Sequence, residues 1–165
     1  VARHLGAIGR KGPELDGLGE HERRRRIRGG VHDPPLELSV AARLVAKAWA
    51  QHGSVRVLTA SEAGTAEVDR ALWLWPATGF LPHCRLDSPL AAETPIVVDH
   101  RVEHDGAAAV LINLSPAPPP FFSRFERLVE IVGGEEGDIA AGRERWRYYK
   151  ERGYALRSHN LGDRT

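Results

Sequence analysis

The sequence predicts an α/β fold: a single three-layer α/β/α domain with a mostly parallel sheet, Rossmann-like but without a nucleotide site. An amphipathic segment, Leu36–His52, is followed at once by the β-rich segment Val55–Ala60 and then by a second amphipathic segment, Thr65–Trp73. Helix, strand and helix joined by short links are typical of a parallel sheet covered by helices. Two further segments, Pro95–Asp99 and Ala108–Leu114, are nearly all apolar, as strands buried on both faces should be.

The first two helices are predicted from spacing and from their ends. Apolar residues in Leu36–His52 recur at intervals of three and four, which places them on one face of a helix, and Gly53 provides a C-cap. In the second helix we expect Thr65 to be the N-cap, because a threonine hydroxyl can accept a hydrogen bond from the first helical turn. Pro76 ends that helix.

The second half of the chain predicts a connector, another helix and a last helix. Gly79–His83 contains Pro82, which fixes its own backbone and makes this connector stiff. The apolar spacing of Phe121–Val129 predicts a helix, and Glu130–Val132 a short final strand. From Arg143 onward there is no glycine or proline until Gly153, so we expect a helix that ends there at a glycine cap.

The chain length, the cysteine count and the length of the apolar runs exclude several classes of protein. A chain of 165 residues is long enough for one domain with a real core and too short for two ordinary ones. Its single cysteine, Cys84, excludes an internal disulfide and any multi-cysteine metal site, and favours a reducing, cytoplasmic setting. No apolar run approaches the ~20 residues that a membrane-spanning helix needs.

Charge is unevenly distributed along the chain. Residues 1–30 hold eight basic and four acidic side chains and residues 143–165 hold seven and three, whereas the body between them has a balance of −7. Duplex binding by the body is therefore disfavoured, because phosphate contacts require Lys and Arg. Residues 1–30 contain seven glycines and no hydrophobic period, so we expect them to be mostly disordered, with a poor edge strand within Arg26–His32. The domain is then residues 31–165, and no function is assigned to residues 1–22.

One group of side chains suggests catalysis or metal binding. His83, Asp99 and His100 could serve a hydrolase or a phosphate-handling enzyme, with Cys84 and His104 nearby in sequence. Nothing in their spacing forces them together, and ordinary loop histidines are the favoured interpretation over a metal site. The turn after the first strand, residues 60–65, lacks both the dinucleotide fingerprint and the phosphate-loop lysine.

The last helix has a distinctive face. Arg143, Arg147, Lys150 and Tyr154 fall on one side of it, with Trp146 beside them. A cationic and aromatic face suits a ligand that is acidic and also carries an apolar group. The alternative is a solvated basic helix whose aromatic residues, Trp146 and Tyr149, lie in the core.

Taken in order, several motifs resemble those of the chi subunit of bacterial DNA polymerase III, over about Leu36–Gly162. They are the Ala-Arg-Leu-Val-Ala-Lys-Ala helix with its following strand (Ala42 to Leu58), Asp69-Arg70-Ala71-Leu72-Trp73, the connector Gly79 to His83, Asn113-Leu114-Ser115-Pro116, the passage Phe125 to Val132, and the closing Arg143, Arg145, Tyr149 and Gly153. Each piece is weak alone, but together they are specific because their order and spacing agree. Members of this family open with an apolar strand before the first helix, and Arg23 to Val31 is a poor version of it.

The resemblance implies an accessory protein without catalytic activity or cofactors, which meets DNA mainly indirectly. Its expected partners are the psi subunit, through it the clamp-loader complex, and the acidic C-terminal tail of single-stranded DNA-binding protein, which ends in Ile-Pro-Phe. The residues expected to bind that tail are Phe80, Leu128, Val132, Arg143, Trp146, Arg147 and Gly153. Two other interpretations stay open: an enzyme that uses His83, Asp99 and His100, and direct single-stranded nucleic-acid binding by the basic ends.

Overall fold

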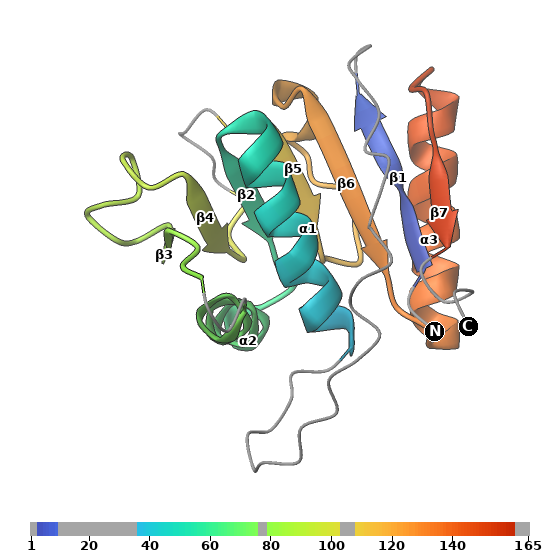
Figure 1. Cartoon of the computed structure of the whole chain (residues 1–165). Helices are drawn as coiled ribbons and strands as arrows, with labels where there is room; N and C mark the ends of the chain where they lie inside the picture. Colours follow the sequence, from blue (N-terminus) through green and yellow to red (C-terminus); the bar gives the residue numbers. More distant parts are fainter. Residues whose placement is uncertain (1–2, 10–35, 76–78, 103–107, 161–165) are drawn as a thin grey trace.

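A seven-stranded sheet forms the middle layer of the molecule (Figure 1). The computed structural model describes residues 3–9, 36–75, 79–102 and 108–160. The strands lie in the order β3-β4-β2-β5-β6-β1-β7, and their bounds are β1 Arg3–Gly9, β2 Val55–Leu58, β3 His83–Arg85, β4 Ile96–Asp99, β5 Val110–Asn113, β6 Arg127–Val132 and β7 Ser158–Asn160. The five from β3 to β6 are parallel, and β1 runs antiparallel to both of its neighbours, β6 and β7. The predicted α/β fold is confirmed.

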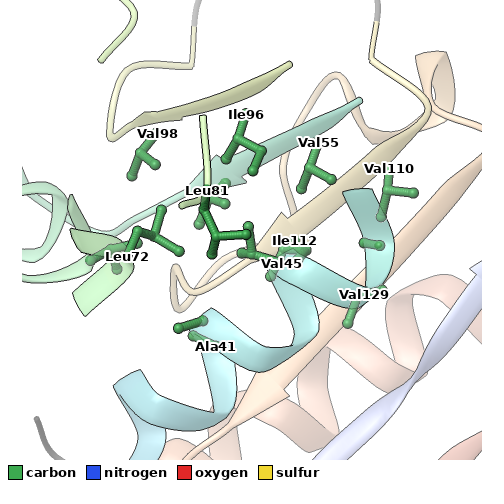
Figure 2. Packing of buried hydrophobic residues seen from close by; sticks show 14 of the residues in the cluster. Ala41, Val45, Val55, Leu72, Leu81, Ile96, Val98, Val110, Ile112 and Val129 are labelled. Carbon is green, nitrogen blue, oxygen red and sulfur yellow. The ribbon is translucent and has the colours of Figure 1, made fainter. Parts of the chain in front are cut away.

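One face of the sheet is covered by the helices α1, Leu36–His52, and α2, Glu62–Leu74 (Figure 1). Figure 2 shows how Val45 of α1 and Leu72 of α2 pack against side chains from four parallel strands, including Ile112. This cluster is almost wholly aliphatic, and most of its side chains are fully buried. It is the main hydrophobic core of the domain.

The other face is covered by α3, Glu136–Glu151, which packs against β6. Alternation along the strands decides which face each residue serves: Val110 and Ile112 of β5 join the main core, whereas Leu111 joins the cluster beneath α3. That second cluster is rich in aromatic residues. Its buried members are Leu58, Leu111, Phe121, Phe122, Phe125, Leu128 and Tyr149.

Helix α1 and strands β2, β4 and β5 lie where the sequence predicts them, whereas the N-cap of α2 is placed differently. Gly53 follows α1 with a φ of +80°, the left-handed conformation expected of a glycine at this position. Ser61, rather than Thr65, is the N-cap of α2: its hydroxyl accepts a hydrogen bond from the backbone of Gly64 at 3.2 Å. Thr65 is buried inside the helix, and its hydroxyl donates to the carbonyl of Ser61.

The predicted helix Phe121–Val129 is wrong. Only Phe122–Arg124 forms a single 3₁₀ turn, and the chain then becomes β6 from Arg127 onward. All six residues of β6 are buried because α1 covers one of its faces and α3 the other, so the strand shows no polar alternation. A short apolar run of this kind has no period that separates a helix from a buried strand.

The ends of the sheet differ from the prediction as well. The connector after α2 continues into β3, and the chain closes with β7, neither of which the sequence predicted. Arg3–Gly9, which lies within the segment expected to be mostly disordered, forms β1. The remainder of the 1–30 segment, including the edge strand expected within Arg26–His32, lies outside the described residues.

Replacing Gly53 with alanine should lower the free energy of unfolding by about 1 kcal/mol, because only glycine adopts a positive φ without strain. A Cβ at this position would meet nothing within 4 Å, so the whole effect comes from the backbone. Urea denaturation measures it. Gly137→Ala is the matched control: position 137 lies in the first turn of α3 and is equally open, so this change should be neutral or slightly stabilising. Equal effects of the two substitutions would contradict the interpretation.

Candidate functional site: the basic face of α3

The outward side of α3 carries a basic face formed by Arg143, Arg147 and Lys150, all of which are exposed. Trp146 lies beside them and is half-buried. The predicted cationic surface with an aromatic neighbour is therefore present. Tyr149, which the alternative interpretation placed in the core, is indeed buried.

Within the described part of the chain, the arginines of this face differ in their partners. Arg147 forms an ion pair with Glu144, with nitrogen–oxygen distances of 3.1 and 3.2 Å, and both side chains are about two-thirds exposed. An exposed pair of this kind contributes little to stability, and an incoming carboxylate can compete for the guanidinium. Arg143 makes no ion pair with any described residue. The basic face can therefore accept an anionic ligand without breaking a buried contact.

The inward side of α3 is held by a buried polar network of Asn113, Glu130, Arg145 and Tyr149. Arg145 donates from Nε to Glu130 at 2.7 Å, and the hydroxyl of Tyr149 donates to the other carboxylate oxygen at 2.6 Å. The amide of Asn113 lies 3.0 and 3.1 Å from the two oxygens. The arginine and glutamate side chains are only 5% and 4% exposed. Each partner is thus shielded from water and satisfied by the others.

Burial governs how these groups titrate. Burial raises the pKa of Glu130, although the positive charge of Arg145 and the hydrogen bonds from Tyr149, Asn113 and Arg145 oppose this. The pKa of Tyr149 is also raised, first by burial and then by the negative charge of Glu130. The phenol therefore stays protonated and acts as a donor.

Leu128 and Val132, two of the predicted binding residues, lie on β6 under α3. Leu128 belongs to the aromatic-rich cluster, and alternation along the strand places Val132 on the same face as Glu130. They are 1% and 2% exposed, so they support α3 from below and do not form the wall of an open pocket. Gly153 follows the helix with a φ of +80°, which lets the chain turn away from it.

Phe80 lies elsewhere. It is 64% exposed, and its ring contacts Trp73 of α2 with the centroids 5.7 Å apart. Trp73 and its neighbour Leu74 are themselves 60% and 40% exposed. These three residues form an apolar patch at the end of α2, the helix on the opposite face of the sheet from α3. The structure therefore does not bring Phe80 together with Arg143, Trp146 and Arg147.

The residues of the alternative, catalytic interpretation are not assembled into one site. Strand register pairs His83 with Ile96, whereas Asp99 lies at the far end of β4. His83 is turned toward Asp69 at 3.6 Å and toward the carbonyl of Leu81 at 2.7 Å. Among the described residues, no group of three His, Cys, Asp or Glu side chains could hold a metal ion. His104 lies outside the described residues.

The carboxylate of Asp99 is bound by a neighbouring arginine. This carboxylate accepts hydrogen bonds from the backbone, Nε and Nη2 of Arg101 at 2.7 to 2.9 Å. Burial alone would raise the pKa of Asp99, but these hydrogen bonds and the positive charges of Arg101 and Arg56 hold it well below its usual value. His100 lies 3.6 Å from this carboxylate and 3.4 Å from Glu62. A carboxylate with such a low pKa is a poor general base at neutral pH.

Sequence reasoning named Asn113 and Arg145 only as parts of motifs and Glu130 only as part of a predicted strand, so it missed the network that they form. A signal was present: Glu130 is the one charged residue in the run from Leu128 to Val132, and Arg145 precedes Tyr149 by one helical turn. A lone acid inside an apolar strand requires a cationic partner. Nothing in the sequence, however, stated which of the many arginines that partner would be.

The comparisons with known proteins identify the family. The sequence model of the family described as "DNA polymerase III chi subunit, HolC" matches residues 31–157. The chain belongs to this family. Membership places it among the chi subunits of DNA polymerase III, and so among the accessory proteins of bacterial DNA replication. The match begins after β1, whose sequence therefore lies outside it.

Three relatives carry the name DNA polymerase III subunit chi. The protein of Pseudomonas aeruginosa is 36% identical over 129 residues, which cover 78% of this chain and 89% of the relative. That of Haemophilus influenzae is 27% identical, covering 74% and 86%. That of Escherichia coli is 25% identical, covering 68% and 78%. The chi-family match thus covers most of the chain. In the described part of the chain, no helix has the length and apolar character to cross a membrane.

The contacts of Asp99 predict a pH-dependent contribution to stability. Because its folded-state pKa is lowered, the contribution is complete above about pH 5 and is lost as the pH falls through the unfolded-state value of about 3.9 and below. Asp99→Asn should therefore lower the free energy of unfolding by about 1.5–3 kcal/mol at neutral pH, the range for hydrogen bonds to a charged group. Denaturant titrations of both proteins from about pH 7 to 3 measure the difference. A difference that stays constant over this range would contradict the assignment.

Proposed function

We propose that this chi-family chain is a non-catalytic adaptor of the DNA polymerase III clamp-loader complex. One surface binds the acidic C-terminal tail of single-stranded DNA-binding protein, and another binds the psi subunit, which links it to the clamp loader. The observation that carries the proposal is the basic face of α3: Arg143, Arg147 and Lys150 are exposed beside a half-buried Trp146.

The chemistry of the tail suits this face. Arginine binds carboxylates through two parallel hydrogen bonds, and the tail offers acidic side chains and a terminal carboxylate. The terminal phenylalanine requires an apolar contact, for which Trp146 is the residue on this face. Leu128 and Val132 lie buried beneath α3 and support it from the sheet. Gly153 follows the end of the helix that carries the site. Phe80 lies outside the proposed tail site, because it contacts Trp73 at the end of α2.

The apolar patch of Trp73, Leu74 and Phe80 is the proposed psi-binding surface. Large aromatic side chains that are about 60% exposed are unusual on a protein without a partner there, and tryptophan is common at the centres of interfaces. The patch lies on α2 and the connector after it, whereas the basic face lies on α3 across the sheet. Separate surfaces allow an adaptor to hold both partners at the same time.

The proposed absence of catalysis rests on the geometry of the alternative site. Asp99 is bound by Arg101, and His83 points to Asp69 instead of toward the Asp99 and His100 pair. Direct binding of single-stranded nucleic acid by the basic face is the second candidate, since the same arginines could contact phosphates. The arginine run of residues 23–28 lies outside the described residues and supports neither candidate.

Binding of a labelled acidic peptide that ends in Ile-Pro-Phe, followed by fluorescence anisotropy, tests the tail site. Arg147→Glu should weaken binding at least tenfold, because it replaces charge-assisted hydrogen bonds worth about 1.5–3 kcal/mol with repulsion. Glu144→Gln should strengthen binding about twofold to fivefold, because it frees Arg147 from its exposed ion pair. Arg70→Glu, the same charge change on the exposed side of α2, is the matched control and should have little effect.

Two results would contradict the tail site. One is a peptide affinity that does not depend on the terminal phenylalanine, since the apolar contact would then be absent. The other is equal loss of affinity in Arg147→Glu and Arg70→Glu, which would indicate attraction by overall charge. Binding of single-stranded DNA in place of the peptide, with a steep dependence on salt, would favour the second candidate.

Co-purification with psi tests the apolar patch. Trp73→Ala combined with Phe80→Ala should reduce psi capture at least tenfold, because central aromatic residues contribute about 2 kcal/mol or more each at interfaces. Both side chains are largely exposed, so the fold should tolerate the change. Leu90→Ala removes another exposed apolar side chain, 59% accessible, and serves as the control. Unchanged psi capture by the double variant, with tail binding intact, would refute this assignment alone.

A further inference from the structure

The helix that carries the basic face is held to the sheet in an unusual way. Only Gly142, Arg145 and Tyr149 of α3 are buried, although the helix runs from Glu136 to Glu151. A surface helix normally presents an apolar stripe to the core. Here two of the three buried residues reach the core through a guanidinium and a phenol, and both donate to Glu130. The buried polar network therefore holds α3 to the sheet together with the aromatic packing of Tyr149 against Phe122.

The network also fixes the helix against a second segment. Arg145 donates from Nη1 to the carbonyl of Pro116 at 3.0 Å, while its Nε is bound to Glu130 of β6. Asn113, at the end of β5, contacts Glu130 and donates to the carbonyl of Ala117 at 3.2 Å. The planar guanidinium fork thus joins the helix to a strand and to the loop after the neighbouring strand. Rotation or sliding of α3 would break several of these contacts together.

The geometry of a helix connects this attachment to the outer surface. Arg145 and Tyr149 lie one turn apart on the inward side, and Arg143 and Arg147 are each two residues from Arg145, on the opposite side. Fixing the inward pair therefore fixes the direction in which the outward arginines point. Trp146, next to Arg145, is fixed at the flank.

We propose that Arg145 and Glu130 are positioning residues for the basic face: the buried network sets the rotation of α3 about its own axis, and thereby the affinity of the tail site. This inference rests on the proposed tail-binding function. The network does not touch the ligand itself. A hydrophobic attachment would permit small rotations of the helix, whereas a hydrogen-bonded one has discrete geometry.

The decisive variant is Glu130→Gln combined with Arg145→Met. Removing both charges avoids leaving either one buried and unpaired, so the double variant should keep most of the thermal stability that Arg145→Met alone loses. The fork that joins α3 to β6 and to Pro116 is nevertheless gone. We expect affinity for the acidic peptide to fall about three- to tenfold, which lies within the range for substitutions that act through a coupled network. Amide hydrogen exchange in α3 should rise relative to that in α1.

Ile112→Ala is the matched control. Ile112 is buried in the main core on the other face, so this variant loses stability without touching the network. Measured well below its unfolding temperature, it should retain wild-type affinity for the peptide and normal exchange in α3. Tyr149→Phe keeps the ring against Phe122 and removes only the hydroxyl donor, so it should give a smaller loss of affinity in the same direction.

The outcomes separate the two proposals. Full peptide affinity in the Glu130→Gln/Arg145→Met protein would show that the network only stabilises the fold and would overturn the positioning role. A wild-type protein that does not bind the peptide would refute the proposed tail site. In that case hydrogen exchange still decides the inference, because unchanged protection of α3 in the double variant would mean that the network does not fix the helix.

Discussion

The ion pair between Glu130 and Arg145 is the buried contact that joins α3, the helix of the proposed tail site, to the sheet. Burying two charges is costly, and it is tolerated here because Tyr149, Asn113 and the carbonyl of Pro116 complete their hydrogen bonds. The same contacts tie β5, β6 and α3 together. A buried ion pair is weak evidence for stability by itself, but it selects one arrangement among several that an apolar surface would permit. The arrangement of α3 in turn determines the direction in which its exposed arginines point.

The two faces of the sheet therefore differ in how their side chains hold the helices. The face under α1 and α2 is an aliphatic core that stabilises the domain. The face under α3 combines aromatic packing with the polar network. Each helical layer carries one candidate surface, the basic face on α3 and the apolar patch on α2. Such a division suits the proposed adaptor, since one shared surface would force the two proposed partners to compete.

The sequence predicted the parts of this structure that depend on local pattern. The period of Leu36–His52, the apolar central strands and the two glycine caps all follow from spacing and backbone freedom. It failed where long-range contacts decide. Phe122, Phe125, Leu128 and Val129 have helical spacing, yet α1 and α3 together turn the last two into a strand. The outer arginines of α3 were predicted, whereas the pairing of Glu130 with Arg145 was not, because partners 15 residues apart cannot be matched without the fold.

Ion pairs engage charged side chains at the edge of the sheet where α/β enzymes usually bind their ligands. Ligands of such folds usually bind outside the carboxyl ends of the parallel strands. Here Arg85, at the end of β3, is paired with Glu62 at the start of α2, and Asp99, at the end of β4, is bound by Arg101. Among the described residues, Arg85 and Asp99 at this edge thus each meet an opposite charge from the same chain. Both candidate surfaces lie instead on the helical layers, the basic face on α3 and the apolar patch at the end of α2, as the proposed recognition of proteins requires.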